Sequence, residues 1–436
     1  MAAPAERVSR NATVQAAGGV WALLLGMGLL MLGNGLQSSL LGVRAASEDF
    51  GSSVTGLVMS GYYIGFLGGS LLTPRAVIHV GHVRVFAAMA SIASIAILVH
   101  SLMVTPPVWA VMRVVTGFAY AGLYVVSESW LNASAGNELR GRLLSVYMVV
   151  SYTGMGGGQL MLNAADPGAF DLFAICSVII SAALVPILLS ATSQPDTTTP
   201  APLPIRQLYR ISPLGTVGCF LTGVAKGATF GMGAVYAHMI GLTVAEVSAF
   251  MAALIVGGAV FQWPLGKLSD RMDRRKVAVG IALGAAVSAA LAVPVAQIST
   301  LGLIALAVPL GGTILTLYSV LIAYTNDHLA HEQMVAASSG LLLALGAGAI
   351  LGPSTAGWAM DILGTAGFLW YLAAIHLVVV VFALYRMMRR SVPVAVRRAL
   401  TATVPTRALP LGTAWSGLTA RSSTEGRDDD TTTSQT

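Results

Sequence analysis

The stretch Gly266-Lys267-Leu268-Ser269-Asp270-Arg271-Met272-Asp273-Arg274-Arg275-Lys276 holds five of the chain's 24 Lys and Arg residues in eleven positions. Long apolar runs flank it, because residues 247–265 and 277–326 contain no Asp, Glu, Lys or Arg. A short basic segment between two such runs is typical of a cytoplasmic loop between transmembrane helices. We therefore expect an Asp–Arg pair at the cytoplasmic ends of two spanning helices, which Gly266 lets approach closely.

The composition places the chain in a membrane. Of its 436 residues, 56% are hydrophobic and only 10% are charged, with a mean hydropathy of +0.77. Soluble domains carry about 25% charged residues, so a soluble enzyme is excluded and we expect no enzymatic activity. Cys176 and Cys219 lie in apolar runs and lack metal-ligand or disulfide spacing, so neither a metal nor a cofactor is expected. No Walker lysine follows a Gly-rich loop, which disfavours an ATP-driven pump.

The apolar runs divide into spans of a length that suits a bilayer. A hydrocarbon core of about 30 Å takes about 20 apolar residues per helix. On that measure the sequence predicts twelve transmembrane helices. Their expected limits are 18–43, 54–77, 83–104, 107–131, 142–163, 170–190, 213–239, 245–266, 276–297, 300–326, 334–358 and 366–388.

The basic residues give the orientation. With the N-terminus inside, 21 of the 24 Lys and Arg residues fall in inner segments, Arg44 alone lies in an outer loop, and Arg113 and Lys226 lie within spans. The outer loops instead carry acids: Glu48, Asp49, Asp166, Asp171, Glu246 and Asp361. The positive-inside rule then predicts a multi-pass protein of the cell inner membrane with both termini in the cytoplasm.

A polar, proline-rich segment at 193–200 breaks the chain near its midpoint and indicates a linker. The expected organisation is a cytoplasmic N-terminal tail at 1–17, an N-terminal six-helix bundle at 18–190, a cytoplasmic linker at 191–212, a C-terminal six-helix bundle at 213–390 and a disordered cytoplasmic tail at 391–436. A shift of 194 residues moves Gly154-x-x-x-Gly158 onto Gly348-x-x-x-Gly352, which favours two pseudo-symmetric bundles.

The pattern G-x-L-x-D-R-x-x-R-R-K at 266–276 resembles the short intracellular loop motif of the major facilitator superfamily of transporters. Arg113-Val114-Val115-Thr116-Gly117 resembles its R-x-x-x-G pattern on helix 4, which is often associated with proton-coupled members. Residues 128–132 with 140–142 look like a little-characterised bacterial subgroup. The resemblance covers about residues 18–390 and implies an all-α membrane protein of the major facilitator fold, with substrate bound near the midplane and alternating access by rocking.

The resemblance also implies that helices 1, 4, 7 and 10 line the substrate cavity. The polar candidates on them are Asn34, Gln37, Arg113, Tyr120, Tyr124, Lys226, Tyr236 and Thr316. A cation inside the membrane is costly unless it is paired or faces water, which favours a function for Arg113 and Lys226. Three alternatives stay open: Arg113 snorkels outward, the tyrosines simply pack, or burial keeps Lys226 neutral.

An inner gate is the second predicted site. We expect Arg75 to pair with Glu128, and Arg271 with Asp327, at the cytoplasmic helix ends. Gly266 and Asp270 of the basic segment complete this set. The alternative is that these carboxylates are solvated groups at the membrane interface, where ion pairs contribute little.

The sequence thus predicts a secondary active transporter of a small solute. No Asp or Glu lies at the depth of Arg113 or Lys226, so the hypothesis is a small organic anion, with protons as coupling ion. One alternative is a proton-coupled multidrug or metabolite exporter, for which an acid deep in the cavity is expected. Another is a membrane sensor that has lost transport. The expected partners are a small-molecule substrate and the lipid bilayer, with no nucleic acid, and the protein is expected to be a monomer.

Overall fold

The computed structural model describes residues 21–134, 137–189, 203–330 and 333–389. Of residues 132–134 and 137–142 it describes the backbone alone. Within these ranges the chain forms helices and no strands, and ten helices are long and apolar enough to cross a membrane. The predicted all-α membrane fold is confirmed. The expectations for the tails 1–17 and 391–436, and for linker residues 191–202, lie outside the described residues.

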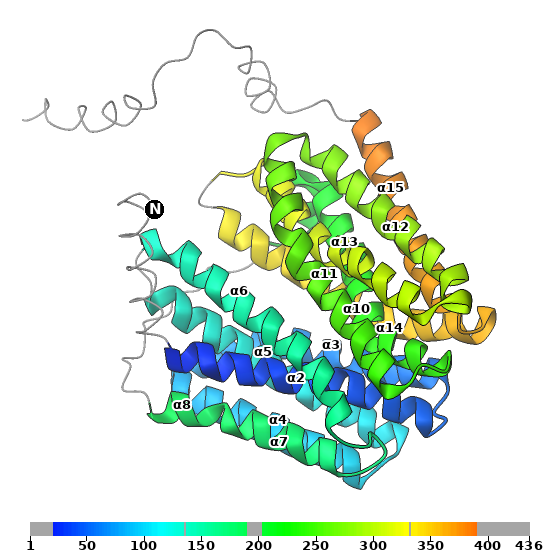
Figure 1. Ribbon diagram of the computed structural model, residues 1–436. Helices are drawn as coiled ribbons and strands as arrows, with labels where there is room; N and C mark the ends of the chain where they lie inside the picture. Colours follow the sequence, from blue (N-terminus) through cyan, green and yellow to red (C-terminus); the bar gives the residue numbers. More distant parts are fainter. Residues whose placement is uncertain (1–20, 135–136, 190–202, 331–332, 390–436) are drawn as a thin grey trace, which may run out of the picture. The chain divides into compact units, whose positions relative to one another are not determined.

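The helices follow one another with short connections (Figure 1). Those of the first half are α2 (Trp21–Ser47), α3 (Ser52–Val80), α4 (His82–Leu102), α5 (Pro106–Ser134), α6 (Asn137–Leu160), the 3₁₀ turn η1 (Met161–Ala164), α7 (Asp171–Ala182) and α8 (Leu184–Leu189). Those of the second half are α9 (Ile205–Ile211), α10 (Pro213–Met239), α11 (Val244–Arg271), α12 (Arg274–Ile298), α13 (Thr300–Asn326), α14 (Met334–Leu363) and α15 (Gly367–Arg389).

Ten of the twelve expected spans are confirmed by length and composition, with α7 and α8 together forming one of them. The other two expected spans coincide with α6 and α10, which have 24 and 27 residues but are not among the ten. In α10 the buried residues include many glycines and threonines. A helix surrounded by protein can be less apolar than one that faces lipid.

Each half packs its helices in the same order. In the first half α3 lies against α5, α2 against α6, and α4 against both α5 and α7. In the second half α11 lies against α13, α10 against α14, and α12 against both α13 and α15. Gly154 and Gly158 bring α6 onto the backbone of α2, just as Gly348 and Gly352 bring α14 onto α10. The packing therefore repeats in the way that the shifted glycine pattern predicts.

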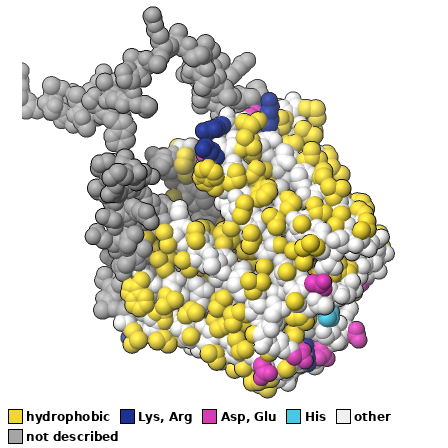
Figure 2. Space-filling view, in the orientation of Figure 1, with side chains coloured by type: hydrophobic (Ala, Val, Ile, Leu, Met, Phe, Trp, Pro, Cys, Tyr) yellow, Lys and Arg dark blue, Asp and Glu magenta, His cyan; other side chains and the backbone are white. Residues whose placement is uncertain are grey.

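The described surface suits a lipid environment. Large side chains such as Trp263, Leu301 and Trp358 are exposed on the helices. Figure 2 shows hydrophobic side chains over most of the visible face, with acidic side chains gathered at one end and most of the visible Lys and Arg at the other. We call the end that carries the α11–α12 turn the motif side, and the other end the opposite side.

The two halves meet on the opposite side. Helix α3 lies against α14, α2 against α10, and α6 against α11. Ser47 Oγ and His238 Nε2 are 3.3 Å apart, the backbone N–H of Ser53 donates to Asp361 at 3.2 Å, and the Asn163 amide donates to Ser248 at 3.0 Å. These bonds join helix ends on that side. In this structure the two halves are therefore in contact on the opposite side.

Candidate functional site

A buried cation lies in the first half. Arg113 of α5 is 5% exposed, and its guanidinium carbon is 4.7 Å from the centroid of the Tyr62 ring on α3. Among the described residues nothing pairs with this guanidinium or accepts a hydrogen bond from it, and its Nε is buried without a partner. Such burial disfavours snorkelling to the membrane boundary. The ring quadrupole offsets part of the cost of the charge, yet the cation lacks an anion.

Aromatic side chains and one amide surround this cation. The Tyr62 and Tyr120 ring centroids are 6.3 Å apart, and those of Phe66 and Tyr124 are 5.9 Å apart. The Asn34 side chain lies near the hydroxyls of Tyr62 and Tyr124. Four predicted residues, Asn34, Arg113, Tyr120 and Tyr124, are therefore brought into one cluster.

Sequence reasoning missed the α3 side of this cluster. On α3, Tyr62, Tyr63 and Phe66 are interleaved with the glycines of Gly61-x-x-x-Gly65-x-x-x-Gly69. These glycines let α3 and α5 pack closely, because a Cβ at Gly61 or Gly65 would collide with the α5 backbone. That close approach is what brings the α3 rings up to Arg113.

A second cation lies in the other half. Lys226 of α10 is half-buried, and its ammonium is 5.3 Å from the ring centroid of Tyr318 on α13. None of the residues described here forms a hydrogen bond or an ion pair with it. Tyr318 is a further residue that the sequence did not single out. The predicted α13 residue, Thr316, is instead fully buried and donates to the Gly312 carbonyl at 2.6 Å.

Glu128 lies apart from its expected partner. No ion pair with Arg75 is formed in the described part of the chain, so this expected pairing is corrected. The Glu128 carboxylate accepts a hydrogen bond from Tyr147 of α6 at 3.4 Å. Glu128 follows Tyr120 and Tyr124 at helical spacings of four residues, so the three share one face of α5.

Two other predicted residues lie away from these groups. Gln37 is fully buried, and neither atom of its amide has a hydrogen-bond partner among the residues that the structure describes. Tyr236 is 1% exposed and stacks on Phe368 of α15 at 4.9 Å, within the second half. The geometry of Tyr236 is that of core packing, as the alternative for the tyrosines allowed.

The motif side carries a local network of charges. Arg274 lies 3.1 Å from both Asp270 and Asp327, so Asp270 does pair across the α11–α12 junction. The partner of Asp327 is thus Arg274, which corrects the expected Arg271. Burial raises the pKa of Asp327 above its ordinary value, although the nearby Arg274 and His328 act to lower it.

The boundary of the motif also differs from the expectation. Helix α11 continues through Arg271, and only Met272 and Asp273 separate it from α12. A Cβ added at Gly266 would meet nothing within 4 Å, so the expected close approach of helix ends at Gly266 is wrong. The short turn is held by Asp273, whose carboxylate accepts from the Arg275 backbone at 3.0 Å and caps α12.

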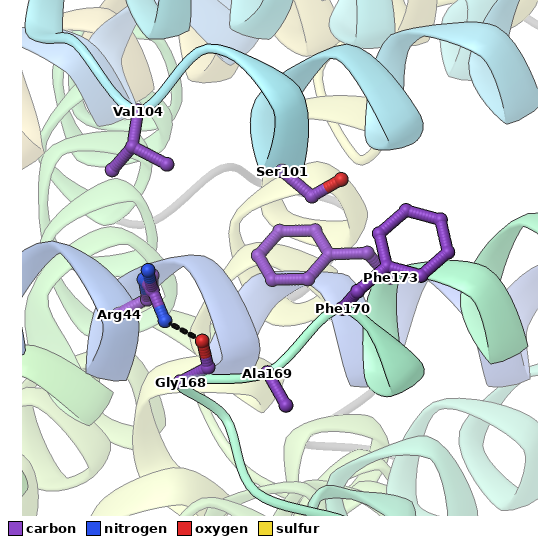
Figure 3. A pocket seen from close by; sticks show the side chains of 7 residues that line it. All are labelled: Arg44, Ser101, Val104, Gly168, Ala169, Phe170 and Phe173. Carbon is purple, nitrogen blue, oxygen red and sulfur yellow. Dashed lines mark hydrogen bonds between the residues drawn. The ribbon is translucent and has the colours of Figure 1, made fainter.

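A small cavity of about 60 Å³ lies on the opposite side (Figure 3). Its lining residues are Arg44, Ser101, Val104, Gly168, Ala169, Phe170 and Phe173. Arg44 donates to the Gly168 carbonyl and pairs with Glu48 at 2.7 Å. None of the predicted binding residues lines this cavity. Arg44 of α2 therefore holds the segment between η1 and α7 in place through its hydrogen bond to Gly168.

Comparison with known sequences agrees with the membrane fold. The family model described as Major Facilitator Superfamily matches residues 215–422. The chain is 30% identical over 341 residues to a protein of Escherichia coli (strain SE11) described as the uncharacterized MFS-type transporter YcaD. The protein of that name in Shigella flexneri matches equally well. Each match covers 77% of this chain and 87% of the relative.

Several solved transporters have a similar fold. The nucleoside transporter NupG aligns with a TM-score of 0.72 at 13% identity, over 86% of this chain and 99% of that one. A bacterial homologue of the human lysosomal transporter Spinster, inward-facing and unoccupied, aligns with a TM-score of 0.66 at 14% identity, over 85% and 95%. A D-xylose–proton symporter aligns with a TM-score of 0.65 at 13% identity, over 86% and 96%. At these identities the likeness shows the fold.

Proposed function

The chain belongs to the major facilitator superfamily, and on that premise we propose that it is a secondary active transporter of a small organic anion. One observation carries the substrate class: Arg113 and Lys226 lie inside the membrane-spanning helices without an ion-pair partner among the described residues. Two unpaired cations are expensive in a dry core. A water-filled path and an anionic solute offset that cost during turnover.

The proposed transport cycle follows from the repeated halves. The motif side faces the cytoplasm of a cell inner-membrane protein, since the basic segments gather there. The bundles at 18–190 and 213–390 rock about a site near the midplane and open it to one side at a time. The protein acts as a monomer, and protons drive the transport. The contacts between the halves on the opposite side support an arrangement that is closed there.

The structural neighbours suggest other solutes, which the charges disfavour. The nucleoside transporter and the D-xylose–proton symporter are named for neutral solutes. A neutral solute leaves both cations of this chain without a counter-charge, whereas one carboxylate can accept a bidentate hydrogen bond from Arg113. The aromatic cluster around Arg113 adds apolar walls on either side of such a group.

The first prediction tests the substrate class in proteoliposomes. Uptake is measured for a panel of small mono- and dicarboxylates, with a nucleoside, D-xylose and an organic ammonium as neutral and cationic probes. We expect uptake of carboxylates alone, and its loss in Arg113→Gln and in Lys226→Gln at unchanged expression. Arg44→Gln is the matched control, because Arg44 already has Glu48 and Gly168 as partners. Normal uptake by both variants, or uptake of the cation alone, would contradict the proposal.

A further inference from the structure

One face of α11 changes from apolar to basic toward the motif side. Val256, Val260 and Trp263 on this face are 50%, 58% and 72% exposed. Lys267 and Arg271 follow at the same helical spacing and are exposed as well. Steps of three or four residues keep all five on one side of a helix, and we call them the α11 stripe. The stripe presents about 10 Å of apolar surface, which ends in an indole ring, and then two cations.

The buried residues of α11 lie on the other side of the helix. A Cβ at Gly311 of α13 would collide with the backbone of Leu254, and one at Gly258 would collide with the side chain of Leu315. Ile255 lies against α6. At about 100° per residue, these three positions of α11 are about half a turn away from the stripe. The stripe therefore faces away from α13 and α6, toward the surrounding bilayer.

The aromatic residue of the stripe marks the level of the lipid headgroups. The Lys267 ammonium lies 4.9 Å from the centroid of the Trp263 ring. Tryptophan is enriched at the membrane–water interface, and a lysine near a helix end extends its amine to the same level. Figure 2 shows Lys and Arg side chains beside hydrophobic ones at the motif side. The boundary between acyl chains and phosphates thus lies within the stripe, between its apolar and its basic residues.

The neighbouring acids leave the cations of the stripe without a counter-charge. Asp270 lies 3.1 Å from Arg274, and Asp273 lies 3.0 Å from Arg275, so both carboxylates already have arginine partners outside the stripe. In the part of the chain that the structure describes, neither cation of the stripe forms an ion pair. The stripe therefore offers a positive charge that matches a phosphate group.

We propose that the α11 stripe binds one anionic phospholipid of the leaflet on the motif side. The phosphate lies between Lys267 and Arg271, and an acyl chain runs along Val260 and Val256. Side chains one turn apart have Cβ atoms about 6 Å apart, so both cations reach one phosphate. The guanidinium can donate two parallel hydrogen bonds to it. This inference does not depend on the solute that the protein transports.

The two parts of the stripe together select the ligand. An acidic peptide matches the two cations, but it leaves the apolar residues beside them exposed. A zwitterionic lipid such as phosphatidylcholine covers the apolar part, but its own cation is repelled by Lys267 and Arg271. A phospholipid with a net negative charge, such as phosphatidylglycerol, satisfies both parts.

The test uses the fluorescence of Trp263, because this ring lies within the stripe. The full chain is reconstituted in phosphatidylcholine bilayers that contain increasing fractions of phosphatidylglycerol with brominated acyl chains, which quench an indole in contact with them. Brominated phosphatidylcholine is the zwitterionic comparison. Each variant is measured with and without Trp263→Phe, and the difference isolates this tryptophan from the others of the chain.

Phosphatidylglycerol should be preferred to phosphatidylcholine at Trp263 by about twentyfold, since each cation near an anionic headgroup contributes about fivefold. Lys267→Gln and Arg271→Gln should each lower the preference by about fivefold, and Lys267→Arg should keep it. The matched control is Arg206→Gln with Arg210→Gln, which removes two exposed cations one turn apart from α9, also on the motif side. This control should leave the preference unchanged.

Equal quenching of Trp263 by the two lipids in the parent chain would overturn the proposal. An equal loss of preference in the α9 control would also overturn it, because the attraction would then be a diffuse effect of the positive charge on the motif side. Both measurements are made without a solute, so their outcome is independent of the solute panel described above.

Discussion

The guanidinium of Arg113 is a buried positive charge that the surrounding side chains must stabilise. It is 5% exposed and has a tyrosine ring, rather than a carboxylate, as its nearest described polar partner. A cation–π contact contributes about 0.5–2 kcal/mol, and its contribution rises when the pair is desolvated. The ring of Tyr62 therefore stabilises the empty protein, and it leaves the charge of Arg113 free to meet a solute.

Replacing the ring should show this contribution directly. Tyr62→Leu is expected to lower the stability of the detergent-solubilised protein by about 1–2 kcal/mol, because the buried charge loses its π partner. Tyr62→Phe keeps the ring and should cost less. The measurement is thermal unfolding, compared with Tyr385→Leu at the exposed Arg389–Tyr385 pair. Equal stability of Tyr62→Leu and Tyr62→Phe would show that the contact contributes nothing.

Asp270 is the second residue with a defined contact to test. It shares Arg274 with Asp327, at 3.1 Å each, on a partly exposed surface. Such pairs are worth about 0–1 kcal/mol, so Asp270→Asn should barely change stability. We expect it to slow the conformational cycle and to leave solute affinity nearly unchanged. Asp327→Asn should act similarly, because it removes the other carboxylate from the same arginine.

Exchange and binding assays in proteoliposomes separate these two effects for Asp270→Asn. Asp273→Asn is a control within the same turn, since Asn can still cap α12. Weaker solute binding by Asp270→Asn at a normal cycling rate would rule out a gate role for the α11–α12 junction.

At the scale of elements, glycines determine how closely α3 and α14 meet on the opposite side. A Cβ at Gly56 of α3 would collide with the Pro353 carbonyl of α14, and one at Gly357 of α14 would collide with the Ser52 carbonyl of α3. Backbones this close leave no room for a side chain. The closed contact between the halves therefore depends on two positions that have no charge and no hydrogen-bonding side chain.

Gly56→Leu or Gly357→Leu should hold the opposite side open. Ser248 is fully buried on the opposite side, so a Ser248→Cys thiol reports the opening of that side to a membrane-impermeant maleimide. We expect faster labelling of this thiol than in the chain that keeps both glycines, and solute exchange reduced by at least about tenfold, since overpacking costs about 1–3 kcal/mol. Gly68→Leu is the matched control on the same helix, because a Cβ there meets nothing within 4 Å. Unchanged labelling in both variants would show that this helix pair does not close the site.

The elements were largely predictable from sequence, and the contacts of charged side chains were not. Apolar length alone gave limits within a few residues for helices such as α10 and α13, because a bilayer fixes the length of a span. The choice of Arg274 over Arg271 as the partner of Asp327 depends on how far α11 extends, and a boundary error of a few residues reverses it. Tyr318 and Tyr62 were missed because aromatic residues in apolar runs are usually packing residues.

At the scale of the whole molecule, the two halves carry different charged and aromatic groups within their helices. The first half supplies Arg113, the tyrosines and Glu128, whereas the second supplies Lys226 and Tyr318. The repeat in packing therefore does not extend to the charged residues. Among the described residues, the ion pairs of each half, Arg44–Glu48 and the Arg274 network, lie at helix ends. The two cations within the helices, Arg113 and Lys226, therefore come one from each half, so the proposed site requires the complete chain.

The composition of α10 has a consequence for how the protein is made. This helix carries Lys226 and falls outside the ten that are apolar enough to cross a membrane by themselves. Each lysine at the centre of a span opposes insertion by about 2.5–3.5 kcal/mol. Its main packing partner, α14, is synthesised about a hundred residues later. We expect α10 alone to insert poorly in a glycosylation-mapping assay, and Lys226→Leu to restore its insertion. The residue at position 226 would then affect membrane insertion of the helix as well as the proposed transport.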